Sequence, residues 1–449
     1  ILYINDLLSD LQNVYPGVSL RGVKLNAVAY ADDITIMSTC KTDLQYLIDK
    51  CVSYGNRWHF EFSQLKSVIL IYGKDTHKNQ SITMKNKILQ PKSQEPHLGN
   101  VLAIDDNNEN QFVESRIVKC QRICFGIQSL GSYLVPITVP IASHLYKTLC
   151  LTKLCYGNEI MTISHKTMNA LESFHAKNAK LFQGLPKNAC NAGSLITIGW
   201  YPIECHIDIL RLCFLWRIMV LPISSLYKLL LIRQLAWFIQ NKVLNHGPMS
   251  TMFSTSIKYG LLTHVINATF YGKCIKLLQW KRIVYDKVCS HWKTSLRVTK
   301  LTFKSLLWLD IDSSSKLYVN FWWKYNVSHS TQSKAIRSII KVLLNVHRFG
   351  KKRCALCNSN LYNSLSHILF QCQCSIDKRN ELWNELFQSC TRSLRVSLNS
   401  MNNEAKTKFL INGFYSPYNN EWDEIYSHIV KYVNILVDEH INATKDLLE

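Results

Sequence analysis

Acidic residues are scarce in this sequence. Its 449 residues include 31 aspartates and glutamates against 52 lysines and arginines, which gives a formal net charge of +21. Residues 400–449 hold eight of the acids and only four lysines, so the first 399 residues carry 48 basic side chains against 23 acidic ones. This imbalance favours a polyanionic partner, with nucleic acid ahead of a membrane surface.

Long uncharged hydrophobic runs are also missing. The most apolar region, residues 210–240, is interrupted by Arg211, Arg217, Lys228 and Arg233. Its longest uncharged run is ten residues, 218–227, whereas a helix needs roughly 20 residues to span a bilayer. The sequence therefore predicts buried helices here and no membrane partner.

Three further absences narrow the class of protein. No signal peptide, fixed-period repeat or low-complexity segment is present, and with 47% hydrophobic and 18% charged residues the chain is globular rather than disordered. Sixteen cysteines are scattered among apolar helical stretches, which indicates reduced, mostly buried thiols in an intracellular protein rather than a secreted disulfide framework. The chain begins ILYINDLL without a methionine, as expected of a fragment.

The hydrophobic pattern predicts an α+β protein whose strands lie near the N-terminus. We expect strands over residues 24–30 and 34–39 joined by a hairpin turn, a helix over 44–54, a second strand pair over 60–62 and 68–72, and strands with loops over 74–96. Residues 111–130 and most of 141–345 favour helices, with breaks at Gly157, Gly184-Leu185-Pro186, Gly199, Pro222 and Gly247-Pro248.

Two adjacent aspartates, Asp32 and Asp33, occupy the first hairpin turn. Turns collect aspartate for local hydrogen-bonding reasons, so solvated carboxylates are one interpretation. The other is a metal site, because paired carboxylates on a rigid hairpin can hold Mg²⁺ ions at a phosphoryl-transfer centre. The spacing of these residues alone leaves both interpretations open.

A second candidate site is the pattern C-x2-C-x9-H-x4-C formed by Cys354, Cys357, His367 and Cys372. Three thiolates and one imidazole suit a closed tetrahedral Zn²⁺ site, and C-x2-C lets both sulfurs reach one ion. Cys374 is a rival ligand, and a set of buried thiols with a structural histidine is the alternative. Basic residues flank the ligands and suggest a further contact with nucleic acid: Lys351, Lys352, Arg353, Lys378 and Arg379.

Several segments together resemble the reverse transcriptases of non-LTR retrotransposons. Tyr30-Ala31-Asp32-Asp33 resembles their YxDD box, and residues 2–7 (LYINDL) resemble the segment that follows their template-positioning motif. Residues 58–67 (WHFEFSQLKS) resemble the next palm motif, and His97-Leu98-Gly99 resembles the primer-grip turn. Leu145-Tyr146 and residues 155–159 (CYGNE) resemble a thumb and linker segment, and the cysteine-histidine pattern resembles the C-terminal cluster of these elements.

The resemblance implies a fold and a set of roles. Asp32 and Asp33 would bind Mg²⁺, Lys66 would act at the leaving pyrophosphate, and Tyr30, Ala31, His97, Leu98 and Gly99 would contact primer and template. The partners would be an RNA template and a DNA primer or target, in a ribonucleoprotein of the cytoplasm and nucleus. The implied segments are a partial palm (1–104), a thumb-like helical region (105–190), a helical linker region (191–345), a zinc-knuckle-like module (346–390) and a helical tail (391–449).

The sequence also departs from the family. Ser63 stands where members commonly have asparagine, and the first catalytic aspartate of the palm would precede residue 1. The expected function is therefore that of a truncated RNA-directed DNA polymerase, inactive as this fragment. The alternative is a non-catalytic, basic nucleic-acid-binding protein with a zinc knuckle. In Trp280-Lys281, Trp292-Lys293 and Trp323-Lys324 we favour core tryptophans with solvated lysines over stacking platforms for bases.

Overall fold

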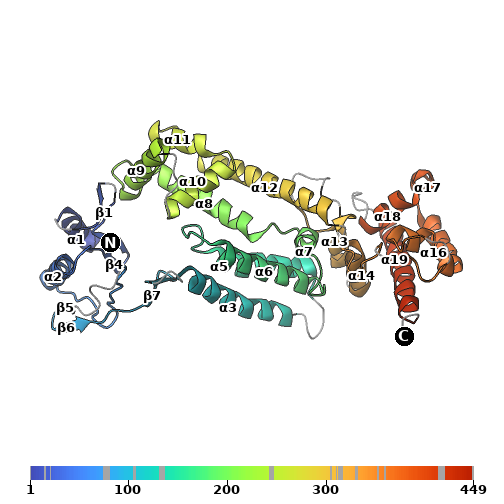
Figure 1. Ribbon diagram of the computed structural model, residues 1–449, viewed down its shortest axis with the longest axis horizontal. Helices are drawn as coiled ribbons and strands as arrows, with labels where there is room; N and C mark the ends of the chain where they lie inside the picture. Colours follow the sequence, from blue (N-terminus) through green and yellow to red (C-terminus); the bar gives the residue numbers. More distant parts are fainter. Residues whose placement is uncertain are drawn as a thin grey trace. The chain divides into compact units, whose positions relative to one another are not determined.

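The computed structural model is mostly helical, with small antiparallel sheets near the N-terminus (Figure 1). This arrangement confirms the α+β class. The structure describes residues 2–14, 17–20, 22–73, 81–104, 108–130, 137–241, 247–303, 306–309, 311, 317–328, 332–350, 353–357, 361–412 and 420–446. None of the helices in these ranges is both long and apolar enough to cross a membrane.

The first hundred residues contain two helices and four two-stranded antiparallel sheets within the described ranges. The helices are α1 (Leu2–Asn13) and α2 (Lys41–Arg57). The strand pairs are β1 (Ser19–Leu20) with β2 (Val23–Lys24), β3 (Ala27–Tyr30) with β4 (Asp33–Ile36), β5 (Ile82–Met84) with β6 (Lys87–Leu89), and β7 (Gln94–His97) with β8 (Asn100–Ala103). The predicted hairpin and the helix that follows it are confirmed, although the strands are shorter than expected.

The β3–β4 hairpin packs on the two helices. Side chains from all three elements form one apolar cluster, in which α1 provides Leu7 and Leu11, β3 provides Ala27, and α2 provides Leu47, Cys51 and Tyr54. The cluster members of α2 recur every three or four residues, which places them on one face of the helix. This packing fixes the base of the hairpin and leaves its turn exposed.

The predicted strand pair over residues 60–62 and 68–72 is wrong. Each segment bonds to another part of the chain: Phe60 N–H donates to the carbonyl of Gly55, and the carbonyl of Ile69 accepts from Lys92 N–H. Only an isolated parallel bridge, Ile69 with Pro91, forms there. The strands predicted beyond residue 74 are confirmed as β5, β6 and β7, while residues 74–80 lie outside the described ranges.

Helices dominate the chain from residue 108 to residue 343. They are α3 (Asn108–Ser129), α4 (Val139–Leu145), the π-helix η1 (Tyr146–Leu151), α5 (Thr152–Cys155), α6 (His165–Phe182), α7 (Asn191–Ile198), α8 (Ile203–Met219), α9 (Leu226–Asn241), α10 (Pro248–Lys258), α11 (Leu262–Phe270), α12 (Leu277–Thr302), α13 (Phe321–Ser328) and α14 (Ser333–Leu343). Every break predicted at a glycine or proline is confirmed. Gly199, for example, ends α7 with a φ of 70°, which a residue without a Cβ adopts at little cost.

The C-terminal helices are α15 (Leu365–Phe370), the short 3₁₀ segment η4 (Gln373–Ser375), α16 (Ile376–Ser389), α17 (Arg392–Ser400), α18 (Asn403–Asn412) and α19 (Asn420–Asp446). Both α15 and α16 pack against α19. Tyr432 of α19 donates a hydrogen bond of 2.6 Å to the carbonyl of Leu369, and its ring meets Trp383 of α16 edge to face. The helix α19 therefore covers the segment that carries the predicted zinc ligands.

The chain divides into two compact units. One comprises Ile1–Arg116, Gly157–Thr167 and Asp208–Val284, and the other comprises Ile117–Tyr156, Met168–Ile207 and Tyr285–Glu449. The predicted division into five successive segments follows chain order and stays a prediction.

The predicted interpretation of the tryptophan-lysine pairs is confirmed for Trp280 and Trp323, whereas Trp292 is only half-buried. Trp280, Trp322 and Trp323 are buried, and their indole N–H groups donate to the carbonyls of Leu212 and Ile411 and to Gln183 Oε1, respectively. Lys281 is exposed as expected, but Lys293 is buried. These tryptophans are core residues and are not available to stack on bases.

Gly157 has no room for a side chain. Its φ is 81°, and a Cβ placed there would lie 2.6 Å from Asn100 Oδ1 and 2.9 Å from Phe112 Cζ. Asn100 begins β8 and Phe112 belongs to α3, so the glycine lies against two other elements. Gly126, in contrast, has open space around it on an exposed part of α3.

We expect opposite effects of alanine at these two glycines. Gly157→Ala should lower the free energy of unfolding by about 2–3 kcal/mol, because it combines an unfavourable φ with overpacking. Gly126→Ala should raise it by about 0.5–1 kcal/mol, because glycine is unfavourable inside a helix. Urea denaturation followed by circular dichroism measures both, and equal effects would contradict the close approach.

Candidate metal centre

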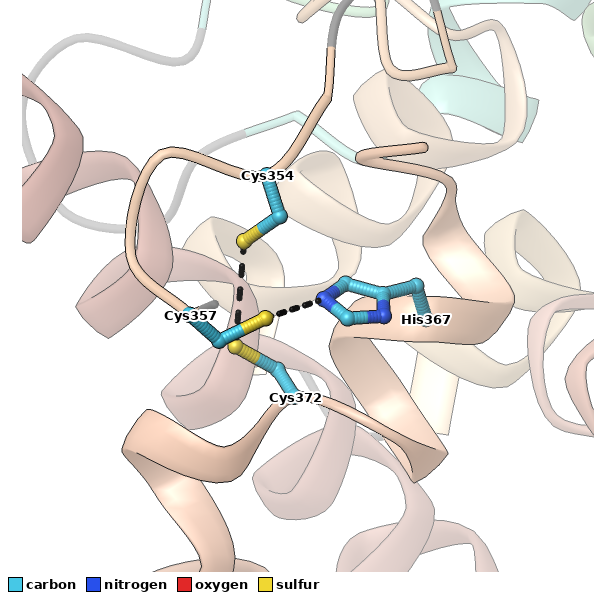
Figure 2. Close-up of side chains that lie close together, drawn as sticks. All are labelled: Cys354, Cys357, His367 and Cys372. Carbon is cyan, nitrogen blue, oxygen red and sulfur yellow. Dashed lines mark hydrogen bonds between the residues drawn. The ribbon is translucent and has the colours of Figure 1, made fainter. Parts of the chain in front are cut away.

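Four predicted ligands, Cys354, Cys357, His367 and Cys372, converge in the structure. One ligand atom from each lies within 4.8 Å of all the others, and no other such group of three or more occurs in the described part of the chain. Figure 2 shows the three sulfurs and the Nε2 edge of the imidazole turned toward a common point. Of the four residues, three are buried and Cys357 is half-buried.

Local hydrogen bonds bring the four residues together. Cys354 follows a β-bridge between Arg353 and Tyr362, and its N–H donates to the carbonyl of Leu361. Ser364 caps α15 by accepting from His367 N–H at 3.1 Å. The carbonyl of His367 in turn accepts from Cys372 N–H at 2.8 Å, which returns the chain toward the histidine immediately after the helix.

The distances between ligand atoms fit a tetrahedral ion. Cys354 Sγ lies 3.9 Å from Cys372 Sγ, and Cys357 Sγ lies 3.4 Å from His367 Nε2. Zinc–sulfur bonds of about 2.3 Å and zinc–nitrogen bonds of about 2.0 Å place the ligand atoms of a tetrahedron roughly 3.5–3.8 Å apart. The sulfurs are too far apart for a disulfide, whose S–S bond is about 2.05 Å. A cluster of three cysteines and one histidine that could hold a metal such as zinc is therefore present.

Cys374, the rival ligand, is not part of the cluster. Its side chain is exposed, and its thiol donates to the carbonyl of Leu356 instead. Only the folded chain excludes it, because a cysteine two residues beyond Cys372 could also reach the ion.

Burial sets the protonation states of the metal-free cluster. It raises the pKa of the Cys372 thiol to about 12, and it lowers the pKa of His367, with Arg379 adding to the second effect. His367 is thus neutral at physiological pH, with Nε2 facing the sulfurs (Figure 2). A divalent cation would reverse the preference of the thiols, because a coordinating thiol loses its proton.

Two further buried atoms near the cluster have no hydrogen-bond partner among the described residues. They are Nδ1 of His367 and Nε2 of His440 on α19. The pKa of His440 is lowered by burial and, secondarily, by the proximity of His367. Both imidazoles are therefore held neutral on the side of the cluster that faces α19.

The flanking basic residues are not equivalent. Arg353 is exposed, but Lys378 pairs with Glu381 at 3.1 Å and Arg379 is buried. Arg379 is therefore not available to contact nucleic acid. Lys351 and Lys352 lie outside the described residues.

The predicted polymerase residues adopt two hairpin turns. Tyr30 pairs with Asp33 across the end of β3 and β4, so the turn consists of Ala31 and Asp32, and Asp33 begins β4. Both aspartates are exposed. In the described ranges no third carboxylate joins them in a group that could hold a metal, and Mg²⁺ binding is therefore not supported by the geometry.

The second turn joins β7 to β8. Leu98 and Gly99 have φ values of 48° and 76°, and His97 pairs with Asn100, as in a two-residue hairpin of the I′ type. Arg116 of α3 donates to the carbonyl of Gly99 at 2.6 Å and to Asn100 Oδ1 at 3.0 Å. No sequence pattern indicates that Arg116 holds the β7–β8 turn, because Arg116 is one of several basic residues on an amphipathic helix.

Lys66 lies apart from both hairpin turns. It is exposed, and its backbone N–H donates to the carbonyl of Ser63 in a turn of its own.

No protein-family model and no curated protein matches this chain.

We expect the full chain to bind one equivalent of Zn²⁺. Cys357→Ser should weaken binding by more than about 100-fold, because losing a ligand costs more affinity than losing a group that only supports a ligand. Cys374→Ser is the matched control and should leave the affinity unchanged, because its sulfur lies outside the cluster. Affinity should rise with pH, since metal binding displaces thiol protons. Competition with a chromophoric chelator measures it, and equal losses in both variants would contradict the assignment.

Proposed function

We propose that the chain is part of an RNA-directed DNA polymerase of the non-LTR retrotransposon type, with a structural zinc centre near its C-terminus. In the intact enzyme Asp32 and Asp33 would hold Mg²⁺ for two-metal nucleotidyl transfer, and Lys66 would act beside the leaving pyrophosphate. The enzyme would copy RNA from a DNA primer within a ribonucleoprotein of the cytoplasm and nucleus.

The β3–β4 turn is the observation that supports this proposal most strongly. Ala31 has a φ of 54°, which costs a residue with a Cβ roughly 1–2 kcal/mol. Such strain persists where the surrounding structure enforces it, and it is concentrated at functional sites. Here the apolar cluster holds the base of the hairpin, and the turn exposes two adjacent carboxylates.

The β7–β8 turn adds a second, separate observation. Its residues carry the resemblance to a primer grip, and residues 155–159 carry the resemblance to the thumb and linker. In the first unit, Asn100 at the end of this turn lies against Gly157 and bonds to Arg116. Asn100 and Gly157 are far apart in the sequence, border or belong to segments that carry the same resemblance, and are thus neighbours.

The zinc centre has a structural role in this proposal. The described residues within 353–372 contain one helix, of six residues. A closed site with four protein ligands leaves no position open for a substrate. The ion would join the Cys354–Cys357 segment to α15 and α16, which pack against α19. The exposed Arg353 would then be presented to nucleic acid from an ordered segment.

A second candidate function is nucleic-acid binding without catalysis. In the described part of the chain no third carboxylate joins Asp32 and Asp33, which favours this candidate. It is also favoured by a basic cluster, defined as Lys273, Lys276, Lys281 and Arg282. All four side chains are exposed, and none pairs with a carboxylate in the described part of the chain. Unpaired cations at this density suit contacts with phosphates.

We expect the chain to bind single-stranded nucleic acid with a strong dependence on salt. Changing all four residues of the basic cluster to glutamine should reduce the slope of log affinity against log salt by up to about 3, or roughly 0.7 for each phosphate that is no longer neutralised. The matched control changes four lysines that already pair with carboxylates, Lys85, Lys92, Lys378 and Lys431, and should alter the slope little. Fluorescence anisotropy between low and physiological salt measures the slope. A flat salt dependence in the wild type would contradict the electrostatic account.

We also expect no template-directed DNA synthesis by this chain alone, because two carboxylates cannot complete a two-metal site. Primer extension on an RNA template with Mg²⁺ is the measurement, with an intact reverse transcriptase as positive control. Extension above background that disappears in Asp32→Asn would show that the chain is catalytically complete, and would rule out the second candidate function.

A further inference from the structure

Arg379 occupies an unusual position beside the candidate metal centre. It lies in the first turn of α16, its residue is only 8% exposed, and its Nη1 donates a hydrogen bond of 2.7 Å to the carbonyl of Cys372. The guanidinium therefore lies against the backbone of one candidate ligand. Its charge is also close enough to His367 to lower the pKa of that imidazole.

No carboxylate balances this buried cation. In the described ranges Arg379 forms no ion pair, although two acids are near it in sequence. Asp377 is exposed, and Glu381 pairs with Lys378 instead. A buried charge is costly unless it is paired or hydrogen-bonded, and a single bond to a carbonyl leaves the net charge uncompensated.

The candidate centre would supply the missing negative charge. Zinc binds thiolates and neutral imidazole, so three cysteines and one histidine around a divalent ion carry one net negative charge. Two opposite charges interact more strongly inside a protein than in water. We propose that Arg379 is the counter-charge of the metal centre and stabilises its metal-bound form. This inference rests on the proposed zinc centre.

A charge effect and a purely structural effect predict different results for two substitutions. Arg379→Gln removes the charge but keeps an N–H donor for the carbonyl of Cys372, and Arg379→Lys keeps the charge. If charge is decisive, Arg379→Gln should weaken Zn²⁺ binding by about 10–100-fold, the range typical of groups that support metal ligands. Arg379→Lys should remain within a few-fold of the wild type. The metal-free Gln variant should not lose stability, because its thiols are then neutral.

Arg116→Gln is the matched control for the loss of a buried arginine. Arg116 is also 8% exposed and also donates to a carbonyl, that of Gly99, in the other compact unit. Its substitution should leave zinc affinity unchanged.

A ligand substitution that makes the metal complex neutral tests the role of the centre's own charge. In Cys357→His the ligands become two thiolates and two imidazoles, a known zinc-binding set whose complex is neutral. Arg379→Gln should then change zinc affinity by less than about 3-fold, because no net charge remains to be balanced. Cys357 is the suitable position for this change, since it is the one half-buried ligand.

The experiment titrates Zn²⁺ into the full-length metal-free chain against a chromophoric chelator and measures metal-free stability in parallel. A large loss in Arg379→Gln, near-normal affinity in Arg379→Lys and a small loss in the Cys357→His background would support the inference. Equal losses in the Gln and Lys variants, or the same loss in both backgrounds, would overturn it while leaving the zinc centre intact. Failure of the wild-type chain to bind Zn²⁺ would overturn the proposed centre and this inference with it.

Discussion

The convergence of three thiols and one imidazole links the Cys354–Cys357 segment to α15 and to the residues that follow it. The described residues within 353–372 hold one short helix, α15, whose buried Leu365, Ile368 and Leu369 belong to a helix that packs against α18 and α19. Backbone bonds from Leu361 and His367 bring the ligands near one another, and α19 covers them from outside. A bound ion would convert this proximity into a cross-link between the Cys354–Cys357 segment and the residues around α15.

A basic chain must also bury some of its positive charge, and the structure does so in two ways. Arg211 pairs with Asp208 at 3.2 Å, and the same carboxylate accepts from Lys258 and Tyr259. Both oxygens of this buried acid are therefore hydrogen-bonded. Arg116, Lys228 and Arg379 instead donate to backbone carbonyls. Among these three, only Arg379 adjoins a set of thiols that can become an anion. That difference explains why its charge can matter to metal binding rather than to folding alone.

Features set by local sequence could be predicted, and features set by distant contacts could not. Helix ends at Gly199 and Pro248, the hairpin around Asp32 and the candidate ligands Cys354, Cys357 and His367 follow from spacing and backbone preference. The strand pair predicted near Phe60 was wrong because its hydrogen bonds are made to Gly55 and elsewhere. The choice of Cys372 over Cys374, and the burial of Arg379, depend on how the chain turns after α15. No pattern of neighbouring residues specifies that turn.

The tryptophan-lysine pairs illustrate why adjacency in sequence misleads on a helix. Consecutive side chains on a helix point about 100° apart around its axis. Trp280 can therefore point into the core while Lys281 points into solvent. An aromatic and a basic side chain share a helix face when they are three or four residues apart, as the exposed Arg122 and Phe125 are on α3. Across a β-bridge the partners are opposite residues, as with the exposed Arg353 and Tyr362 beside the metal ligands. Any stacking of bases on this chain must therefore use exposed aromatics of this kind, because the buried tryptophans already hold the core together.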